Sequence, residues 1–534
     1  MNNLPLNYSD MYIGIVLTAT SIVLARGIMN LYKIIDNISW LKKTHYSSDD
    51  YKIVKDFPPI IICIPMLREQ RTAKSTIEYF SSLEYAKKDY QLVIVTTEKE
   101  RYDKDVYKKR LPQIYADLKQ GISLASFVDR YLGVFSEAEL VHLFQAKDKG
   151  ISLKEITEKF NQIPSTEDIA QEEAKRINKK VGFELIKVLH YPKNHRTVSE
   201  QINYAIDYYR DIKRYERGYF ALYNADSRPS LTILYDALVT KANFERKYNY
   251  SPQVMQQSSL FTLNYGMFKN NLNGFLLKAS ALFQTKWTLT HEFSILRSQS
   301  DTAMKIKKVT NPLAKIWYSR LGICITHGLF LSMKLIKTQY MPTDTVTEDL
   351  PLGYYLSCLN EPIVPIPSIE NSESPVTLGS LFNQKKVWFW PYLQYEQCKR
   401  RVLKHSLYQS TISVYLITFQ GQLRGLTWLL QSPILILSFL GLVMFNHWQV
   451  IEFSLLAIII YWFIPIYIVL KQLNSLENES GKGLTTLSSR DYIYTPLSGL
   501  LVLASHSYGP ILTCIDYLKE ILFGKVYVKQ KTER

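Results

Sequence analysis

Four long uncharged runs of apolar residues interrupt an otherwise mixed pattern of hydrophobic and polar positions. Three of them lie near the C-terminus, at Gly425 to Phe445, Phe453 to Leu470 and Tyr492 to Ile515. Their lengths are close to the ~20 residues that cross the hydrocarbon core of a bilayer, so each is a candidate membrane span. The fourth, Met11 to Ala25, is shorter, but it continues past Arg26, whose long side chain can reach the headgroups. We therefore predict an N-terminal anchor and three or four C-terminal crossings.

The distribution of lysine and arginine predicts how these segments are oriented. Basic residues from Arg26 to Lys43 follow the first run, which puts the N-terminus outside and the chain from residue 33 onwards in the cytosol. The basic tail from Lys519 to Arg534 also has a cytosolic character. Three C-terminal crossings would leave this tail outside, so a fourth crossing or a re-entrant segment is needed. His405 to Leu423 could span the membrane or lie in its interface as an amphipathic helix, and the sequence leaves both open.

Between residues 57 and 404 short apolar runs alternate with segments of helical spacing. Ala73, Ile77 and Phe80 follow the spacing of a helix, and a second helix is expected over residues 201–209. The alternation predicts an α/β domain with a mostly parallel sheet and helices on both faces. Ligands in such sheets bind at the carboxyl ends of the strands. The expected strands are residues 58–66, 91–97, 183–189 and 219–223.

Residues 101–180 depart from this alternation, because their pattern is helical and polar throughout. The motif GISL occurs twice, and Ser152 with Glu155 forms a capping box. The stretch LKEITEKF resembles the first half of a helix-turn-helix, but no basic recognition helix follows it. We therefore predict a compact helical insertion that can dock a protein partner, and we do not expect nucleic acid as a partner.

Composition and charge narrow the class of protein further. A mean hydropathy of −0.10 with 21% charged residues excludes a chain made mainly of membrane spans and also a disordered one. The net charge of +16 suits the anionic inner leaflet of a membrane. Five cysteines without a CxxC pair predict buried thiols and not a disulfide framework or a zinc site. The expected domains are an anchor over 1–45, a cytosolic domain with the insertion over 46–404, and C-terminal helices with a basic tail over 405–534.

Two groups of polar residues stand at positions suited to chemistry. Asp226 comes shortly after YFALY, and together with Asn224 it offers oxygen ligands to Mg²⁺ or Mn²⁺. An Asx turn that closes the strand explains the same residues. Glu348 and Asp349 stand side by side in TVTEDLPLG, where the partly apolar setting makes two adjacent charges costly. A helix N-cap formed by Thr347 or Asp349 is the structural alternative to a catalytic role.

Four motifs occur in a fixed order and are followed by the cluster of candidate spans. They are IPMLREQ at 64–70, NAD at 224–226, TED at 347–349 and QKKVW at 384–388. This order resembles the membrane-integrated branch of glycosyltransferase family 2, whose relatives include cellulose, hyaluronan and poly-N-acetylglucosamine synthases. The resemblance covers residues 58–100 and 181–515. It implies a GT-A fold with a mixed, mostly parallel sheet, and an inverting transfer from a nucleotide-diphosphate sugar, most commonly UDP-linked, with Mg²⁺ or Mn²⁺ as cofactor.

The resemblance also implies roles for individual residues. Asp349 corresponds to the base that takes the proton of the acceptor hydroxyl, and Glu348 orients it or its loop. A neighbouring like charge and an apolar setting would raise the pKa of such a base. The donor-binding residues are Pro65, Glu69, Glu98, Arg196, Asn224 and Asp226, the acceptor-binding residues are His327, Gly328, Gln384 and Trp388, and the metal ligands are Asp226 and Asn224.

The chain departs from the family's pattern at several of these positions. Arg68 replaces an Asn, Asn224 replaces the first carboxylate of D-x-D, and Val387 replaces the Arg of Q-x-x-R-W. A Lys that lies near the phosphates in the family is missing, so Arg196 or Lys193 would have to supply its charge. These departures bear on metal affinity and on processive synthesis, since the metal-binding pair and the acceptor motif are both incomplete.

The expected protein is a multi-pass transferase of the cell membrane with a cytosolic catalytic domain, bound to membrane lipids. It would transfer a sugar from a nucleotide sugar to a growing surface polysaccharide or glycolipid. One alternative is a transferase that adds a single sugar to a lipid-linked acceptor. Another is a catalytically degenerate transferase that serves as a membrane scaffold and recruits a protein partner through its insertion.

Overall fold

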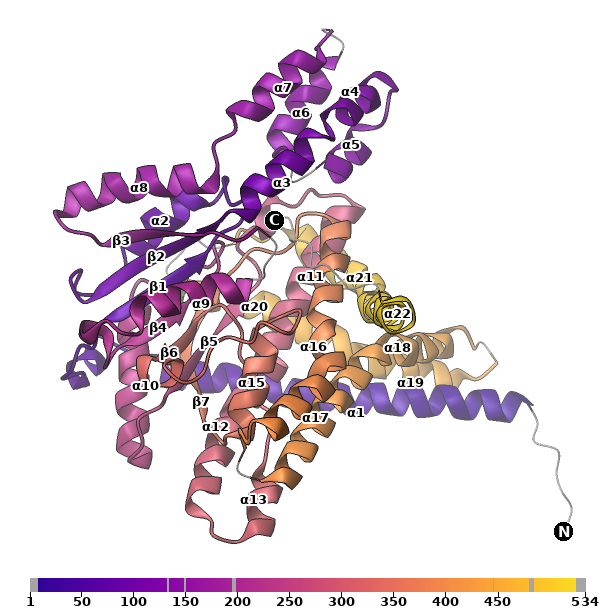
Figure 1. The fold of residues 1–534 in the computed structure, drawn as a ribbon. Helices are drawn as coiled ribbons and strands as arrows, with labels where there is room; N and C mark the ends of the chain where they lie inside the picture. Colours follow the sequence, from indigo (N-terminus) through magenta and orange to yellow (C-terminus); the bar gives the residue numbers. More distant parts are fainter. Residues whose placement is uncertain are drawn as a thin grey trace, which may run out of the picture.

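The computed structural model of the chain describes residues 8–131, 134–147, 150–194, 198–408, 410–444, 446–479 and 485–524. It consists of a sheet domain, a helical insertion and a group of long apolar helices (Figure 1). The first helix, α1 (Tyr8–Thr44), links the apolar helices to the sheet domain. Its Val16 approaches Gly441, whereas the amide nitrogen of its Asn37 donates to the Leu289 carbonyl at 2.8 Å.

A seven-stranded mixed sheet forms the centre of the soluble domain. Its strands are β1 (Ile60–Pro65), β2 (Tyr90–Thr97), β3 (Ile186–Tyr191), β4 (Tyr219–Leu222), β5 (Val254–Leu260), β6 (Leu329–Ser332) and β7 (Ile363–Asn371). Their order in the sheet is β3-β2-β1-β4-β6-β5-β7, and all pairings are parallel except those of β6 with β4 and β5. The predicted mixed, mostly parallel sheet is therefore confirmed. The four predicted strands are present, and β5, β6 and β7 are additional strands.

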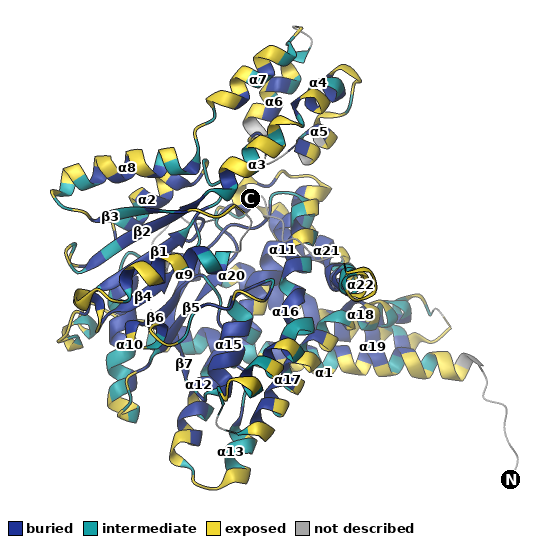
Figure 2. Cartoon of the chain, in the orientation of Figure 1, coloured by how far each residue is buried: buried dark blue, intermediate teal, exposed yellow. Residues whose placement is uncertain are grey.

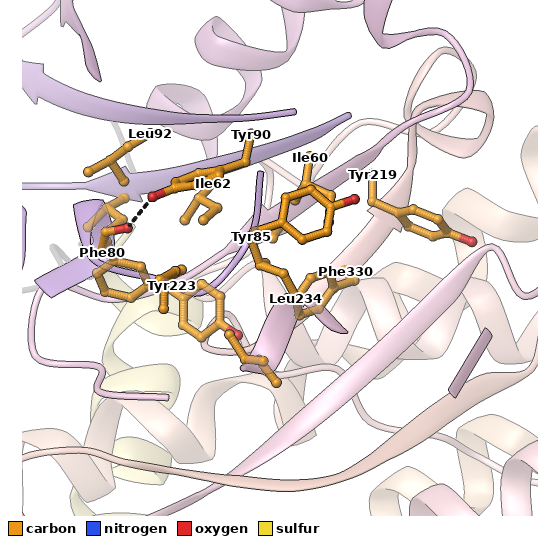
Figure 3. Close-up of a cluster of buried hydrophobic side chains, with 14 of the residues drawn as sticks. Ile60, Ile62, Phe80, Tyr85, Tyr90, Leu92, Tyr219, Tyr223, Leu234 and Phe330 are labelled. Carbon is orange, nitrogen blue, oxygen red and sulfur yellow. Dashed lines mark hydrogen bonds between the residues drawn. The ribbon is translucent and has the colours of Figure 1, made fainter. Parts of the chain in front are cut away.

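Helices cover both faces of the sheet. Alternate residues of the central strands point to opposite faces, so the apolar strands contribute side chains to a core on each side. Ile60 belongs to the core on one face and its neighbour Ile61 to the core on the other. Figure 3 shows the first core, in which the Tyr90 hydroxyl donates to the Phe80 carbonyl at 3.2 Å. The covering helices are α2 (Ala73–Ser81), α8 (Thr166–Val181) and α10 (Ile233–Tyr248) on the first face, and α9 (Val198–Tyr209), α12 (Phe293–Lys308) and α15 (Asp349–Cys358) on the second.

The insertion has a hydrophobic core of its own and projects from the sheet domain (Figure 1). Its helices are α3 (Lys99–Lys108), α4 (Leu111–Lys119), α5 (Leu124–Tyr131), α6 (Glu137–Gln145) and α7 (Leu153–Gln162). Leu111, Phe127 and Phe160 are buried in this core, and the capping box at Ser152 is present. The range 101–180 also contains α8, but α8 packs on the sheet through Ala170 and neighbouring apolar residues. The self-contained unit is therefore formed by α3 to α7.

The remaining helices lie around the sheet domain and along α1. They are α11 (Leu272–Trp287), α13 (Pro312–Tyr318), α14 (Met333–Ile336), α16 (Leu378–Lys404), α17 (Thr411–Leu429), α18 (Gln431–Leu440), α19 (Trp448–Ile458), α20 (Ile464–Glu479), α21 (Ser489–Ala504) and α22 (Tyr508–Phe523). A π-helical turn at Thr288–Glu292 joins α11 to α12, and another at Ile459–Phe463 joins α19 to α20. In Figure 1, α16 and α17 cross the direction of α1, whereas α18 and α19 lie beside it.

Four segments of the described chain are long and apolar enough to cross a membrane, namely Asp10–Thr44, Thr411–Val443, Trp448–Glu477 and Ser489–Phe523. The second joins two stretches that the sequence pattern separates, because only Leu430 lies between α17 and α18. Large apolar side chains such as Ile28, Phe419 and Leu522 are exposed on these helices (Figure 2). These features are typical of a membrane-associated protein, and the orientation in the membrane stays a prediction.

Candidate active site

The loops that follow β1 and β4 meet at the point where the strand order of the sheet reverses. From β1 the chain proceeds outwards through β2 and β3, and it then returns to the other side of β1 as β4. Crevices at such a point bind ligands in open α/β sheets. The two loops are tied together here, because the Arg228 guanidinium donates to Ser75 Oγ at 3.2 Å and to Thr76 Oγ1 at 3.0 Å. Residues 223–229 therefore have a fixed position beside the first turn of α2.

Asp226 lies at this reversal point, the candidate crevice, and is buried. Its Oδ2 accepts a hydrogen bond from the backbone nitrogen of Glu373 at 3.2 Å. The Glu373 carboxylate in turn forms an ion pair with Arg71, in the loop after β1. Burial acts to lower the pKa of Arg71, but its hydrogen bond to Glu373 and the nearby carboxylates raise it overall. The crevice therefore contains a firmly charged arginine next to a buried carboxylate.

The residues around Asp226 fit a divalent cation only if the substrate supplies further ligands. Within the described residues, no group of three or more His, Cys, Asp or Glu side chains is arranged to hold a metal ion. Asp226 is buried and Asn224 is partly exposed at the open side of the same turn. Mg²⁺ is commonly held by one or two carboxylates together with substrate phosphates, and this donor set suits that mode.

A buried histidine–carboxylate pair lies next to Asp226. His327 Nδ1 is 2.8 Å from Glu370 Oε1, and Glu370 is completely buried at the end of β7. Burial acts to lower the pKa of His327, but the charges of Glu370, Glu292 and Asp226 raise it above its usual value. Burial also raises the pKa of Glu292 to about 7. A histidine whose pKa is raised therefore lies beside the predicted donor carboxylate, and a buried glutamate lies near that histidine.

Gly328 fixes the position of this histidine. It has a φ of +67°, and a Cβ atom added there would lie 2.6 Å from the Cβ of Gln257. Its carbonyl accepts from the Gln257 nitrogen at 2.7 Å, which fastens the loop before β6 to β5. A left-handed conformation and so close an approach both require glycine.

Aromatic rings connect His327 to the predicted acceptor residue Trp388. The ring of Phe261 lies 6.1 Å from the His327 ring and 6.1 Å from Trp388. Trp388 is partly exposed, whereas Gln384 is buried and its Oε1 accepts from the Gln284 amide at 3.1 Å. Trp388 is thus available to an acceptor beside the crevice, while Gln384 contacts α11.

Asp349 begins helix α15, and its side chain is partly exposed. Its Oδ1 accepts from the adjacent Leu350 nitrogen at 2.8 Å. Helix α15 packs against α16, the helix that carries Trp388. Burial is the largest cause of the raised pKa of Tyr392 in α16, and the charge of Asp349 contributes to the same change.

The structure supports the helix-capping explanation of the TED motif only in part. Glu348 occupies the N-cap position of α15 and makes no capping hydrogen bond. Its side chain is buried, and within the described residues its Oε2 and the hydroxyl of Thr347 have no hydrogen-bond partner. The helix does begin at Asp349, where a negative charge is favourable. Capping thus explains the position of Asp349 and leaves Glu348 without a structural role.

The other predicted donor residues lie along the ends of β1 and β2. Pro65 ends β1, and Glu69 in the following loop accepts from Thr72 Oγ1 at 2.9 Å. Glu98, after β2, is engaged by His190 Nε2 at 3.0 Å and by Arg101 at 3.1 Å. The interactions of Glu98 are therefore formed within the protein.

Of the two residues that could replace the missing phosphate-binding lysine, Arg196 lies outside the described residues. Lys193 is described and exposed, and its carbonyl accepts from Thr97 Oγ1 at 3.4 Å. The phosphate-binding role proposed for this segment stays a prediction.

Several charged residues of the crevice do not follow from the sequence motifs. They are Arg71, Arg228, Glu292, Glu370 and Glu373. A signal was present for two of them, because Glu370 and Glu373 follow the apolar run IVPIPSI, which reads as a strand with acidic residues at its carboxyl end.

Comparisons with known proteins give similarity to solved structures only. No protein-family model matches the chain, and no curated protein matches it. The chain is similar to mannosyltransferase PcManGT from Pyrobaculum calidifontis in complex with GDP-Man and Mn²⁺, with 9% identity over 95% of this chain and 99% of that chain and a TM-score of 0.41. It is also similar to residues 1–349 of S. aureus TarS in complex with UDP-GlcNAc, with 10% identity, coverage of 84% and 92%, and a TM-score of 0.32.

Proposed function

We propose that this protein is a membrane-bound inverting glycosyltransferase of GT-A fold that uses a nucleotide-diphosphate sugar, most commonly UDP-linked. The observation that carries the proposal is the position of buried Asp226 at the reversal point of the sheet, beside Arg71 and the His327–Glu370 pair. This crevice combines a carboxylate for a cation with arginines for phosphates. The order of the sequence motifs supports the same function.

In the proposed reaction the acceptor oxygen forms a bond to the anomeric carbon while the bond from that carbon to the diphosphate breaks. The bonding electron pair leaves with the diphosphate, and Asp349 takes the proton of the acceptor hydroxyl. Glu348 orients this base, and Trp388 packs against the apolar face of an acceptor sugar. Asp226 and Asn224 would hold the Mg²⁺ or Mn²⁺, which neutralises charge on the leaving diphosphate.

The protonated His327 supplies a further positive charge beside Asp226. Its pKa is raised by Glu370, so the imidazolium persists closer to neutral pH than in an ordinary histidine. A positive charge at this position favours binding of a diphosphate. The proposal thus uses the buried pair for electrostatic stabilisation.

We also propose that the catalytic domain is cytosolic and that a cell membrane holds it through the four apolar segments. The exposed apolar side chains of these segments support burial in lipid. An acceptor embedded in the same membrane would reach Trp388 and Asp349 from the side of α16.

Incubation of membranes containing the protein with a panel of radiolabelled nucleotide sugars tests this function. We expect label in a membrane-extractable product with at least one donor, and its loss in Asp349→Asn. Sizing the product distinguishes a polymer from a single shifted lipid. A complete failure of every donor, with folded protein present, would favour the scaffold instead.

A further inference from the structure

Lys385 is buried in the protein, and in the described part of the chain its ammonium group has no carboxylate partner; it lies 5.9 Å from the centre of the Phe382 ring. It follows Gln384 in α16, and only 2% of its surface is exposed. Within the described residues its Nζ forms no hydrogen bond and no ion pair. Burial lowers its pKa to about 8. An isolated buried charge is costly, so its retention indicates an anion that the protein binds.

The Lys385 side chain borders a pocket of about 380 Å³ between α11, α16 and α21. Apart from Lys385, Ser505 is the one polar residue of its lining, and the other side chains are apolar. A Cβ atom at Gly509 would lie 2.7 Å from the Lys385 Cβ, so the start of α22 holds the lysine in place. The pocket therefore combines apolar walls with a single cation. Its apolar lining residues are Leu276, Leu378, Leu381, Phe382, Leu501, Val502 and Ala504.

Further cations lie on the same side of the molecule and have no carboxylate partner in the described part of the chain. Burial, together with the charges of Lys33, Lys286, Arg26 and Arg424, lowers the pKa of His291 to about 3. These four cations therefore lie close enough to act on one imidazole. The nearest polar contact of Lys286 is neutral, since its Nζ donates to the Tyr461 carbonyl at 2.9 Å.

The pocket and this group of cations adjoin each other. His506 follows the pocket residue Ser505, and its ring lies 4.4 Å from Phe283. The Lys286 Nζ lies 5.9 Å from the centre of the same Phe283 ring. At the opposite end of the group, Arg424 acts on Tyr392, the tyrosine on which the charge of Asp349 also acts. A band of positive charge thus extends from the pocket towards the proposed base.

We infer that the pocket binds the phosphate-linked lipid of the acceptor, with the phosphate at Lys385 and the hydrocarbon chain along the leucines, and that a sugar attached to this lipid carries the acceptor hydroxyl. The inference deepens the proposed transferase function and rests on it. The apolar walls match a hydrocarbon chain, and the unpaired cation matches a phosphate. A neutral polysaccharide supplies neither, so the site favours a lipid-linked acceptor over a growing polymer.

Direct binding tests the site. The full chain is placed in phosphatidylcholine nanodiscs, and retention of radiolabelled polyprenyl monophosphate is measured. Lys385→Met should weaken binding by about tenfold or more, because a charge-assisted contact to the phosphate is lost. Lys385→Arg should retain binding. The matched control is Lys386→Met, since Lys386 lies next in the helix and pairs with Asp516. It should bind as the wild type does.

Competition by unlabelled lipids identifies the occupant. Unlabelled polyprenyl monophosphate should displace the labelled lipid. Uncharged polyprenol, which lacks the phosphate, and inorganic phosphate, which lacks the hydrocarbon chain, should each need a concentration at least about tenfold higher. Equal competition by phosphatidylglycerol would show a site for bulk anionic lipid and would overturn the acceptor assignment. Unchanged binding in Lys385→Met would overturn the inference altogether.

Stability separates a ligand-binding role from a structural one. Removing an uncompensated buried charge should leave the thermal unfolding temperature of the lipid-free protein unchanged or higher in Lys385→Met. A lower temperature in both Lys385→Met and Lys385→Gln, with unchanged lipid affinity in the folded fraction, would indicate a structural lysine.

The two proposals fail in distinguishable ways. Transfer to a soluble sugar acceptor that is the same in Lys385→Met and wild type, without lipid-phosphate binding, would overturn this inference and leave the transferase intact. Lysine-dependent binding of the lipid phosphate without transfer from any donor would overturn the transferase and the acceptor role together. The expected result is a raised KM for a sugar linked to a polyprenyl phosphate in Lys385→Met, with an unchanged KM for the nucleotide sugar.

Discussion

His327 Nδ1 lies 2.8 Å from a carboxylate oxygen of Glu370, although the strands next to these two residues are not neighbours in the sheet. His327 is in the loop before β6 and Glu370 is at the end of β7, with β5 between these strands. Both side chains are buried. The pair therefore connects the loop of Gly328 to the crevice of Asp226. A substitution of either residue should affect the position of the loop as well as the charge of the crevice.

Glu370→Gln should lower the stability of the protein at low pH more than at high pH. Glu370 holds the pKa of His327 above its ordinary value of 6.5, so the pair stabilises the wild type below about pH 6.5 and this contribution is lost as pH rises through the raised pKa. We expect the variant to be less stable by roughly 3–5 kcal/mol at low pH, where it leaves a buried imidazolium unpaired. Thermal unfolding in detergent across pH 5 to 8, as the assay window, measures the difference.

The control for this prediction is the same substitution in a His327→Gln background. Without the imidazole, the effect of Glu370→Gln should not vary across the neutral range. Glu292, whose pKa burial raises to about 7, is also affected by the charges of His327 and Glu370, so it is replaced by Gln in every protein of this comparison. A pH-independent difference between wild type and Glu370→Gln would contradict the assignment of the charge to His327.

Gly328→Ala should destabilise the protein and impair transfer. The positive φ alone costs an alanine roughly 1–2 kcal/mol, and contact with Gln257 adds to this. The substitution displaces the loop that holds His327, so donor affinity should fall together with the unfolding temperature. Gly266→Ala is the matched control, because no atom lies within 4 Å of the added Cβ there. An unfolding temperature equal to wild type in Gly328→Ala would show that the loop relaxes freely.

The central strands could be predicted from the sequence, whereas β5 could not. Residues of β1 and β2 form continuous apolar runs, which is the usual pattern of parallel strands buried on both faces. β5 reads VMQQSSL and is equally buried. Its polar side chains are satisfied internally, since Gln256 Nε2 donates to the His327 carbonyl at 2.8 Å. A hydrophobicity pattern cannot reveal a strand whose burial depends on such hydrogen bonds.

The candidate site likewise contains residues that could be predicted from the sequence and residues that could not. Asp226 and Asp349 could be selected by their motifs, because Asp226 follows the apolar run YFALY and Asp349 forms a pair of adjacent charges with Glu348. Glu370 and Arg71 could not be associated with Asp226, since only the strand order brings the ends of β1, β4 and β7 together. Lys385 was visible in QKKVW, but its lack of a partner depends on the packing of α11, α21 and α22.

Asp226→Asn should weaken metal-dependent donor binding as well as turnover. Loss of the carboxylate removes a charged ligand from the proposed cation, so the apparent Kd for the nucleotide sugar should rise by about tenfold or more. The reciprocal variant Asn224→Asp restores a second carboxylate and should raise the affinity for Mn²⁺. Titration of donor at fixed Mn²⁺, and of Mn²⁺ at fixed donor, measures both effects. Donor affinity that is independent of Asp226 and of added metal would contradict the metal-bridged mode.

Deletion of the insertion should leave the sheet domain folded. Replacing residues 109–162 with a short Gly/Ser linker removes the separate core of α4 to α7. The flanking segments remain tied, because Glu100 accepts from the Thr166 nitrogen at 2.7 Å and Lys104 donates to the Ile163 carbonyl at 2.7 Å. Nucleotide-sugar binding should be largely intact, while capture of a protein partner should be lost. Failure of the shortened chain to fold would show that the insertion completes the core.

Asp349→Asn tests the catalytic assignment against helix capping. The substitution preserves shape but removes the proton acceptor, so transfer should fall by roughly 10² to 10⁴. Donor binding should change little, because the helix of Asp349 packs against α16, which carries the predicted acceptor residue Trp388. Capping alone predicts a different result, since Asn is about as good as Asp at the start of a helix.

Glu348→Gln provides the matched control for Asp349→Asn within the same motif. Glu348 is buried and makes no capping bond, so its substitution should reduce transfer less than loss of the base does if it only orients the loop. Both variants are compared with wild type at equal amounts of folded protein, by initial rates and by donor Kd. Near-normal transfer by Asp349→Asn would remove Asp349 from the mechanism, and a larger loss in Glu348→Gln would instead assign the base to Glu348.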